Sequence, residues 1–127
     1  MTVAYVDTSC IVAIGLEEPG SEDLAAHLER YDRLVSSNLL EAELQATFAR
    51  EKVDSGRHLL TWLTWVFPDR PLSVEIGRVL RSGYVRGSDL WHLANALYVS
   101  ESPAELPFIT LDARQKEVAS ALGFPTS

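Results

Sequence analysis

Cysteine is almost absent from this chain, and so are the features that direct a protein to a membrane. Cys10 is the single cysteine, which excludes an internal disulfide and any zinc site built from cysteines. The longest apolar runs, such as residues 59–67, are far shorter than the about 20 residues that span a bilayer. The opening residues MTVAYVDTS contain no basic segment followed by an apolar one. We therefore expect a cytoplasmic protein that does not enter a membrane.

Positive charge is also scarce. The chain contains 11 Lys and Arg against 18 Asp and Glu, which gives a formal net charge of -7 at pH 7. Phosphate contacts rely on Lys and Arg, so this balance by itself argues against nucleic-acid binding. Divalent cations bound to some of the acids would reduce the negative charge without removing it. The sequence also lacks a glycine-rich phosphate loop with its lysine, which leaves ATP-type chemistry without support.

The composition is that of a globular protein. Of the 127 residues, 46% are hydrophobic and 23% are charged, which is not typical of a disordered chain. The length suits one domain with a single core and is too short for two. We therefore expect a single domain over residues 1–127.

Short apolar runs alternate with amphipathic stretches along the chain. Strands are predicted at residues 3–6, 33–36 and 108–110, with a weaker strand near 72–74. Helices are predicted at residues 11–16, 21–28, 38–53, 57–66, 76–84, 88–100 and 113–122. Ser55 and Gly56 interrupt the helical pattern. Strands that alternate with helices predict an α/β fold, in which helices cover both faces of a parallel sheet.

Four acids occupy positions that such a sheet would bring together. Asp7 follows the first strand and Asp112 follows the last, and open parallel sheets bind ligands at the carboxyl ends of their strands. Asp89 lies in the first turn of a helix, where the positive end of the helix favours a carboxylate. Glu43 lies in a helix among apolar and small residues. Each acid alone has an ordinary reading as a turn, cap or surface residue, so the prediction of a site depends on the combination.

Clustered carboxylates repel one another, so they either keep protons through raised pKa values or bind hard cations. Carboxylate oxygens are the ligands that Mg²⁺ and Mn²⁺ prefer. A bound cation lowers the pKa of its water and can hold phosphate oxygens during attack. The pattern therefore indicates a Mg²⁺ or Mn²⁺ site.

Four segments, in this order, resemble the motifs of the PIN-domain family. The first is Tyr-Val-Asp-Thr-Ser at residues 5–9, and the second is Leu-Leu-Glu-Ala-Glu-Leu at residues 39–44. Residues 88–96 look like the family's D-x-x-H-L-A-x-A segment, and residues 109–112 resemble its closing T-x-D segment. The resemblance covers nearly the whole chain. It implies a PIN-like three-layer α/β/α sandwich whose central parallel sheet has four to five short strands.

The order and spacing of the acids resemble those of small bacterial toxin ribonucleases of the VapC type. The resemblance implies that catalysis and the binding of Mg²⁺ or Mn²⁺ are carried by Asp7, Glu43, Asp89 and Asp112. Ser9 and Thr110 become hydroxyls that support these acids or orient water. We interpret His92, one helical turn after Asp89, as a packing or hydrogen-bonding residue and not as a metal ligand.

The resemblance also implies an RNA substrate, a small antitoxin protein with a basic tail, and a homodimer. Arginine pairs with carboxylates through two parallel hydrogen bonds, so the tail would reach Asp7 and Asp89 and displace the metal. Candidates for RNA contact flank the acids in the sequence: Arg50, Lys52, Arg86, Arg114 and Lys116. Apolar stripes at residues 24–28 and 59–66 could supply a dimer or antitoxin surface, although core packing explains them equally well.

Two features depart from the family pattern. Trp91 is bulkier than the residue usual at its position, and residues 123–127 leave little room for a final edge strand. Among other classes, a haloacid-dehalogenase-type phosphatase needs an aspartate where Ser9 stands, and a receiver domain needs an acidic pair and a lysine that are not here. A metal-free ribonuclease would have to use the three histidines, which share no motif: His27, His58 and His92. The serious alternative is a PIN-like interaction module that does not cleave RNA.

Overall fold

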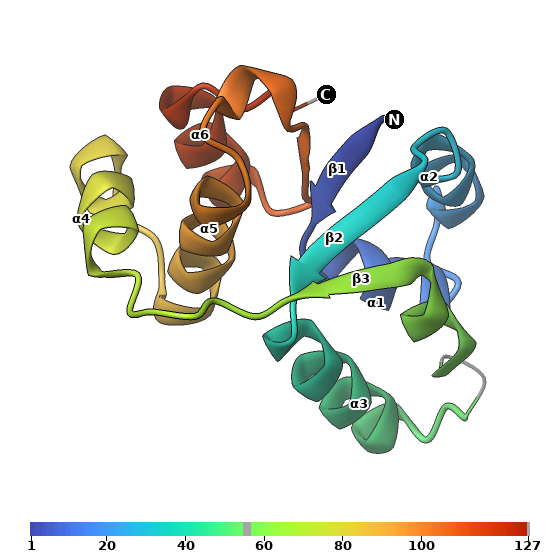
Figure 1. Ribbon diagram of the computed structural model, residues 1–127. Coiled ribbons are helices and arrows are strands. Elements are labelled where there is room, and N and C mark those ends of the chain that lie inside the picture. The colour runs from blue at the N-terminus through green and yellow to red at the C-terminus, as the bar shows by residue number, and fades with distance from the viewer. Residues whose placement is uncertain (55–56, 127) are drawn as a thin grey trace.

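The computed structural model describes residues 1–54 and 57–126 and is organised around a parallel sheet (Figure 1). The sheet contains β1 (Val3–Val6), β2 (Arg33–Ser37), β3 (Leu63–Val66) and β4 (Phe108–Ile109). The spatial order of the strands is β3-β2-β1-β4, and every neighbouring pair is parallel. β1 therefore lies inside the sheet, and Asp7 follows it at the carboxyl edge.

Helices cover both faces of this sheet. One face carries α1 (Thr8–Gly15), α2 (Ser21–Leu28) and α3 (Leu39–Glu51). The other face carries α5 (Gly87–Val99) and α6 (Ala113–Leu122), and α4 (Ser73–Ser82) packs on their outer side (Figure 1). The predicted three-layer α/β/α architecture is confirmed. In the part of the chain that the structure describes, no helix has the length and apolar character needed to cross a membrane.

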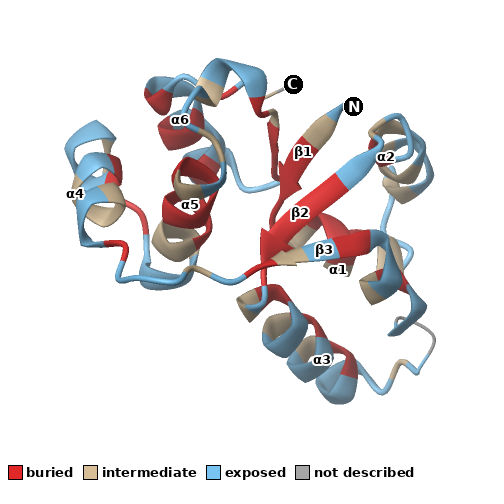
Figure 2. Cartoon of the chain, in the orientation of Figure 1, coloured by how far each residue is buried: buried red, intermediate tan, exposed pale blue. Residues whose placement is uncertain are grey.

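Two hydrophobic cores lie on either side of the sheet (Figure 2). They arise because successive side chains of a strand point to opposite faces. On β1, Ala4 and Val6 belong to the core beneath α1 and α3, whereas Tyr5 belongs to the core beneath α5 and α6. The Tyr5 ring stacks on Phe108 of β4, with ring centroids 5.1 Å apart and planes 5° from parallel. Tyr5 is therefore fixed in the middle of the second core.

The helices α1 and α3 pack very closely at Gly15. A Cβ atom at Gly15 would lie 2.1 Å from Cζ of Phe48, on α3. Side-chain carbons do not approach an aromatic ring to this distance, so a glycine is required here. This contact fixes α3, which carries Glu43, against α1, the helix that follows Asp7.

Most predicted elements are present, but the assignment of residues 57–74 is wrong. Instead of a helix over residues 57–66, the chain forms a 3₁₀ segment, Arg57–Trp62, followed by β3. The predicted strand near residues 72–74 does not form, because Leu72 directly precedes α4. A short apolar run cannot be assigned to helix or strand from its periodicity. Pairing with β2, from Leu34 opposite Leu63 to Ser37 opposite Val66, decides the outcome for β3.

The C-terminal segment covers the β4 edge of the sheet. The backbone N–H of Phe108 donates to the carbonyl oxygen of Pro125 at 2.8 Å, and the rings of Phe108 and Phe124 lie 5.9 Å apart. Up to residue 126 this segment forms no strand, so the sheet of the described residues has four strands. Ser127 lies outside the described residues, as do Ser55 and Gly56, where the helix interruption is predicted.

Candidate active site

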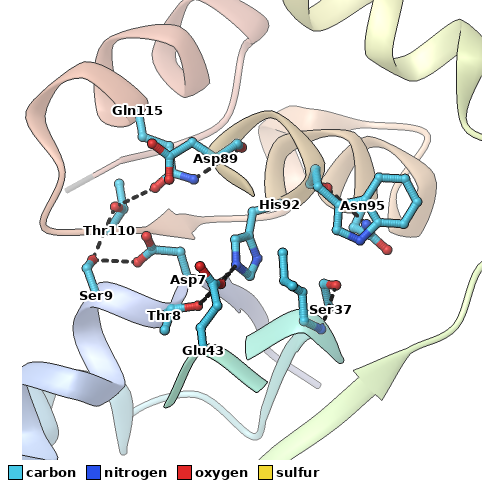
Figure 3. A network of polar contacts seen from close by, with 12 residues as sticks. Asp7, Thr8, Ser9, Ser37, Glu43, Asp89, His92, Asn95, Thr110 and Gln115 are labelled. Carbon is cyan, nitrogen blue, oxygen red and sulfur yellow. Dashed lines mark hydrogen bonds and ion pairs between the residues drawn. The ribbon is translucent and has the colours of Figure 1, made fainter. Parts of the chain in front are cut away.

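The four predicted acids lie at the carboxyl edge of the sheet, where helices from its two faces meet. Asp7 is the residue between β1 and α1, and Glu43 lies in the second turn of α3. Asp89 lies in the first turn of α5, and Asp112 is the residue that caps α6. In Figure 3, Asp7, Glu43 and His92 point toward one another, and Asp89 lies on the same helix as His92.

Asp7 is a buried acid with 3% of its surface exposed. The Ser9 hydroxyl donates a hydrogen bond to Asp7 Oδ1 at 2.7 Å. Burial raises the pKa of Asp7 above its ordinary value, and the hydrogen bond from the Ser9 hydroxyl only partly opposes this effect. The ionised form of Asp7 is therefore disfavoured until an additional positive charge approaches it.

Glu43 has the opposite environment. The Thr8 hydroxyl donates to Glu43 Oε1 at 2.7 Å, and His92 Nε2 lies 3.2 Å from the same oxygen. The hydrogen bond with His92 lowers the pKa of Glu43 below its ordinary value, and Thr8 adds to this effect against the opposing effect of burial. Glu43 is therefore held as a carboxylate at the opening of the site.

The pKa of Asp89 is shifted by burial and by the charges of neighbouring acids. Burial raises the pKa of Asp89, and the negative charges of Asp112 and then of Glu43 raise it further, while the charge of Arg86 acts in the opposite direction. Like charges shift one another's pKa in this way only when they are close. The acids of α3, α5 and α6 are therefore within electrostatic range of one another.

The metal-binding capacity of this arrangement follows from its free oxygens. Within residues 1–54 and 57–126, no three His, Cys, Asp or Glu side chains lie close enough to hold a metal ion between them. The hydrogen bonds to Glu43 and Asp112 reach only Oε1 and Oδ1, respectively, and the Asp89 carboxylate accepts none from the described residues. The remaining oxygens are the donors that Mg²⁺ and Mn²⁺ prefer. The chemistry of these donors therefore fits a hard cation.

Ser9 and Thr110, the two predicted hydroxyls, connect the loop after β1 with the loop after β4. Their oxygen atoms lie 3.5 Å apart, and Ser9 Oγ also accepts from the N–H of Leu111 at 3.0 Å. Thr110 Oγ1 accepts from the N–H of Asp112 at 3.0 Å. These contacts hold Asp7 and the Asp112 loop at a fixed separation.

Three further residues of the site have no role assigned from the sequence. The Tyr5 hydroxyl lies 2.7 Å from His92 Nδ1, and Thr8 contacts both Glu43 and His92. Gln115, which is 0% exposed, accepts from Thr110 Oγ1 at 2.7 Å and donates to the carbonyl oxygen of Asp89 at 3.3 Å. Asp112-x-x-Gln115 has the spacing of a helix-capping box, a signal that could have identified Gln115. Tyr5 and Thr8 carry no such signal.

Three of the basic residues predicted to contact RNA lie beside the acids: Arg86, Arg114 and Lys116. Arg86 directly precedes α5, and its charge acts on Asp89. Arg114 lies in the first turn of α6, where its Nε donates to the Tyr84 carbonyl oxygen at 3.0 Å and Nη1 lies 3.0 Å from Glu117. Lys116 follows on the same helix. These three exposed residues, each within four positions of Asp89 or Asp112 in the sequence, are called the basic rim below.

Arg50 and Lys52, the other two candidates, lie farther away. They are at the C-terminal end of α3, about two turns beyond Glu43. Arg50 Nε lies 3.2 Å from Glu51 Oε1, and both side chains are exposed. This pair is therefore separated from the acids by roughly 10 Å of helix.

The apolar stripes at residues 24–28 and 59–66 are mainly core. Leu28, Leu59 and Leu63 are buried, and Trp62 retains 36% exposure. Trp91, the bulky departure in the third motif, is half-buried, and α5 continues through it without a break. Core packing therefore accounts for most of the apolar residues considered for a partner surface.

The chain matches the family model of the PIN domain over residues 4–121. This interval contains all four acids, and it extends from β1 into α6. The comparison with curated proteins found no match.

Proposed function

Because this chain belongs to the PIN-domain family, whose members are typically metal-dependent nucleases, we propose that it is an endoribonuclease that requires Mg²⁺ or Mn²⁺. The observation that carries the proposal is the placement of four acids at the carboxyl edge of the sheet: Asp7, Glu43, Asp89 and Asp112. The pKa of Asp89 is raised by burial and then by the charges of Asp112 and Glu43, as expected where carboxylates gather, and a bound cation would relieve this repulsion.

The acids would hold the cation through their carboxylate oxygens: Asp7, Glu43, Asp89 and Asp112. The bound cation would lower the pKa of a water molecule and stabilise negative charge on the phosphate. Ser9 fixes the orientation of Asp7 through its 2.7 Å hydrogen bond, while Thr110 supports the Asp112 loop. The N-terminus of α1, directly after Asp7, would present backbone N–H groups to a phosphate.

The RNA would approach over the α5–α6 side of the site. Arg86, Arg114 and Lys116 lie there, beside Asp89 and Asp112. The negative net charge of the chain makes this rim the favoured place for phosphate contact, since the exposed acids elsewhere repel RNA. Arg50 and Lys52 would contribute only to a longer substrate.

The finer proposal is that the protein is a VapC-type toxin of a toxin–antitoxin pair and acts as a homodimer. Its support is the resemblance in the order and spacing of the acids. An acidic site on an acidic protein suits an arginine-bearing peptide, so a basic antitoxin tail would reach Asp7 and Asp89 and displace the metal.

The test is cleavage of single-stranded RNA with Mg²⁺ or Mn²⁺ and with EDTA. We expect cleavage with either cation and none in EDTA, and Asp7→Asn should be inactive. Glu41→Gln is the control and should remain active. Glu41 lies on α3 two residues before Glu43, but it is exposed and accepts a hydrogen bond from Gln45. Undiminished cleavage in EDTA would exclude the metal-dependent mechanism.

The alternative is a PIN-like interaction module without nuclease activity. Titration with Mn²⁺ in a calorimeter separates the two functions, since only the enzyme needs the cation. Absence of both cation binding and RNA cleavage in the wild-type protein would favour the interaction module.

A further inference from the structure

A continuous row of hydrogen-bonding groups leads from β2 through Tyr5 and His92 to Glu43, and Figure 3 shows its last part, where His92 lies beside Thr8 and Glu43. The N–H of Ser37 donates to the Tyr5 hydroxyl at 3.0 Å, and that hydroxyl lies 2.7 Å from His92 Nδ1. His92 Nε2 lies 3.1 Å from Thr8 Oγ1 and 3.2 Å from Glu43 Oε1. Tyr5 is 0% exposed and His92 is 1% exposed, so water does not compete for these contacts.

The direction of the hydrogen bonds follows from their donors. Tyr5 is a buried phenol with one proton to donate. Its oxygen accepts a hydrogen bond from the Ser37 N–H, and we assign its own proton to His92 Nδ1, which lies 2.7 Å away. A neutral imidazole that accepts at Nδ1 carries its proton on Nε2. His92 therefore donates toward Thr8 and Glu43.

The Tyr5 ring cannot turn away from this arrangement. It stacks on Phe108 at 5.1 Å on one side, and it meets the His92 ring edge-on, with centroids 5.8 Å apart and planes 76° apart. The stacking comes from β4 and the edge contact from α5, so two elements hold the phenol in place.

We propose that Tyr5 and His92 are a positioning pair, in which Tyr5 sets the tautomer of His92 and His92 orients Glu43 for metal binding. This inference rests on the proposed function, because it assigns Glu43 to the cation. Glu43 Oε1 receives the donors of Thr8 and His92, and Oε2 accepts no hydrogen bond from the described residues. The pair thus fixes one carboxylate oxygen and leaves the other for the metal.

Core packing alone does not require these polar groups. A phenylalanine and a leucine would fill similar space, whereas a buried hydroxyl and imidazole lose their hydration and must be paired. The pairing here leads to one exposed end, the Glu43 carboxylate, whose side chain is 32% exposed. Partners that orient a metal ligand in this way typically change metal affinity 10- to 100-fold when they are removed.

Two substitutions of His92 separate orientation of Glu43 from packing. In His92→Gln, the amide reaches the position of Nε2 and can still donate to Glu43. In His92→Asn, the shorter amide reaches the position of Nδ1 and can pair only with Tyr5. Both variants replace the same buried ring, so their melting temperatures should fall by similar amounts.

The readouts are Mn²⁺ affinity by calorimetry and kcat/KM for RNA. We expect His92→Gln to retain Mn²⁺ affinity within about threefold and His92→Asn to lose about tenfold or more. Equal Mn²⁺ affinities of the two variants, or weaker binding by His92→Gln, would overturn the proposal.

The tautomer of His92 is measured by ¹⁵N NMR of the metal-free protein and needs neither metal nor RNA. We expect the Nε2–H form in the wild type and a mixture in Tyr5→Phe, which lacks the phenol proton. A wild-type signal from the Nδ1–H form would overturn the role of Tyr5. If the wild-type protein bound no Mn²⁺, the proposed function would have failed, and the NMR measurement would still decide the arrangement of the pair.

Discussion

The two halves of the site are built differently. On the α3 side, Glu43 receives donors from Thr8 and His92, and its pKa is lowered. On the α5–α6 side, the Asp89 carboxylate accepts no hydrogen bond from the described residues, and its pKa is raised by burial and by Asp112. The Glu43 carboxylate therefore has hydrogen-bond donors within the protein, whereas the Asp89 carboxylate has none among the described residues and would gain them from a bound cation. Metal binding should therefore change the second half more.

Asp7 lies between the two halves, and its substitution should have the largest effect. Asp7→Asn should reduce RNA cleavage by at least about 100-fold, because a neutral amide at this position is a poor ligand for a hard cation. The metal-free variant should melt at an equal or higher temperature, since a buried acid of raised pKa is removed. A marked fall in the melting temperature would show that Asp7 is mainly a structural residue.

Charge reversal tests whether RNA lies over the second half. The double variant Arg114→Glu, Lys116→Glu should weaken RNA binding strongly, and the slope of log K against log salt should flatten by about one for each lost phosphate contact. Mn²⁺ affinity should change little. The control is Arg50→Glu, Lys52→Glu, which makes the same charge change at the far end of α3. Equal losses of RNA affinity in the two double variants would show that RNA does not prefer the α5–α6 side of the site.

Substitution of Gln115 tests how much the α5–α6 side of the site depends on the buried hydrogen bonds of this residue. Gln115→Met keeps the length of the side chain but leaves the Thr110 hydroxyl and the Asp89 carbonyl without this partner. The free energy of unfolding, from urea denaturation, should fall by about 1–3 kcal/mol. Gln45→Met, at an exposed position on α3, should change it by less than about 0.5 kcal/mol. Similar losses in both variants would argue against a special role for Gln115.

The smallest effects, but of opposite sign, are expected from the pH dependence of metal-free stability. Glu43 has a lowered pKa, so its stabilising contribution is present above its ordinary pKa and is lost as the pH falls through the lowered value. Asp89 has a raised pKa, so its contribution is present in acid and is lost as the pH rises through the raised value.

At pH 7, Glu43→Gln should therefore lower the melting temperature and Asp89→Asn should raise it, and both differences should diminish in acid. Melting curves from neutral to acidic pH in the presence of a chelator measure these differences. Shifts of the same sign at pH 7 would mean that the two halves are electrostatically alike.

The sequence predicts the layers of the fold and the neighbourhood of Asp7 and Asp112 because both depend on local pattern. Alternation of strands and helices requires a parallel sheet, and an acid after a strand lies at its carboxyl edge. The same local patterns do not predict β3, because pairing with β2 and not the pattern of its own residues decides its conformation. The apolar stretch around it is compatible with a helix until that partner is known.

The support of the site is harder to predict for a different reason. Tyr5 has the pattern of an ordinary core residue, and only the approach of α5 brings His92 within 2.7 Å of its hydroxyl. Both residues can be read from the sequence, but the packing that brings α5 to the end of β1 cannot be predicted from it. Gln115 is the exception, since its spacing from Asp112 is a local capping signal.

The position of β1 between β2 and β4 has a consequence for how the protein folds during its synthesis. Tyr5 and His92 are 87 positions apart, and Ser9 and Thr110 are 101 positions apart, so contacts of long sequence separation assemble the site. Contacts of long sequence separation form late, after loop closure has been overcome. A chain still emerging from the ribosome carries Asp7 and Glu43 but not β4 or α6. The proposed site is therefore complete only after the segment with Asp112 and α6 has been synthesised, and we expect a nascent chain without this segment to be inactive as a nuclease.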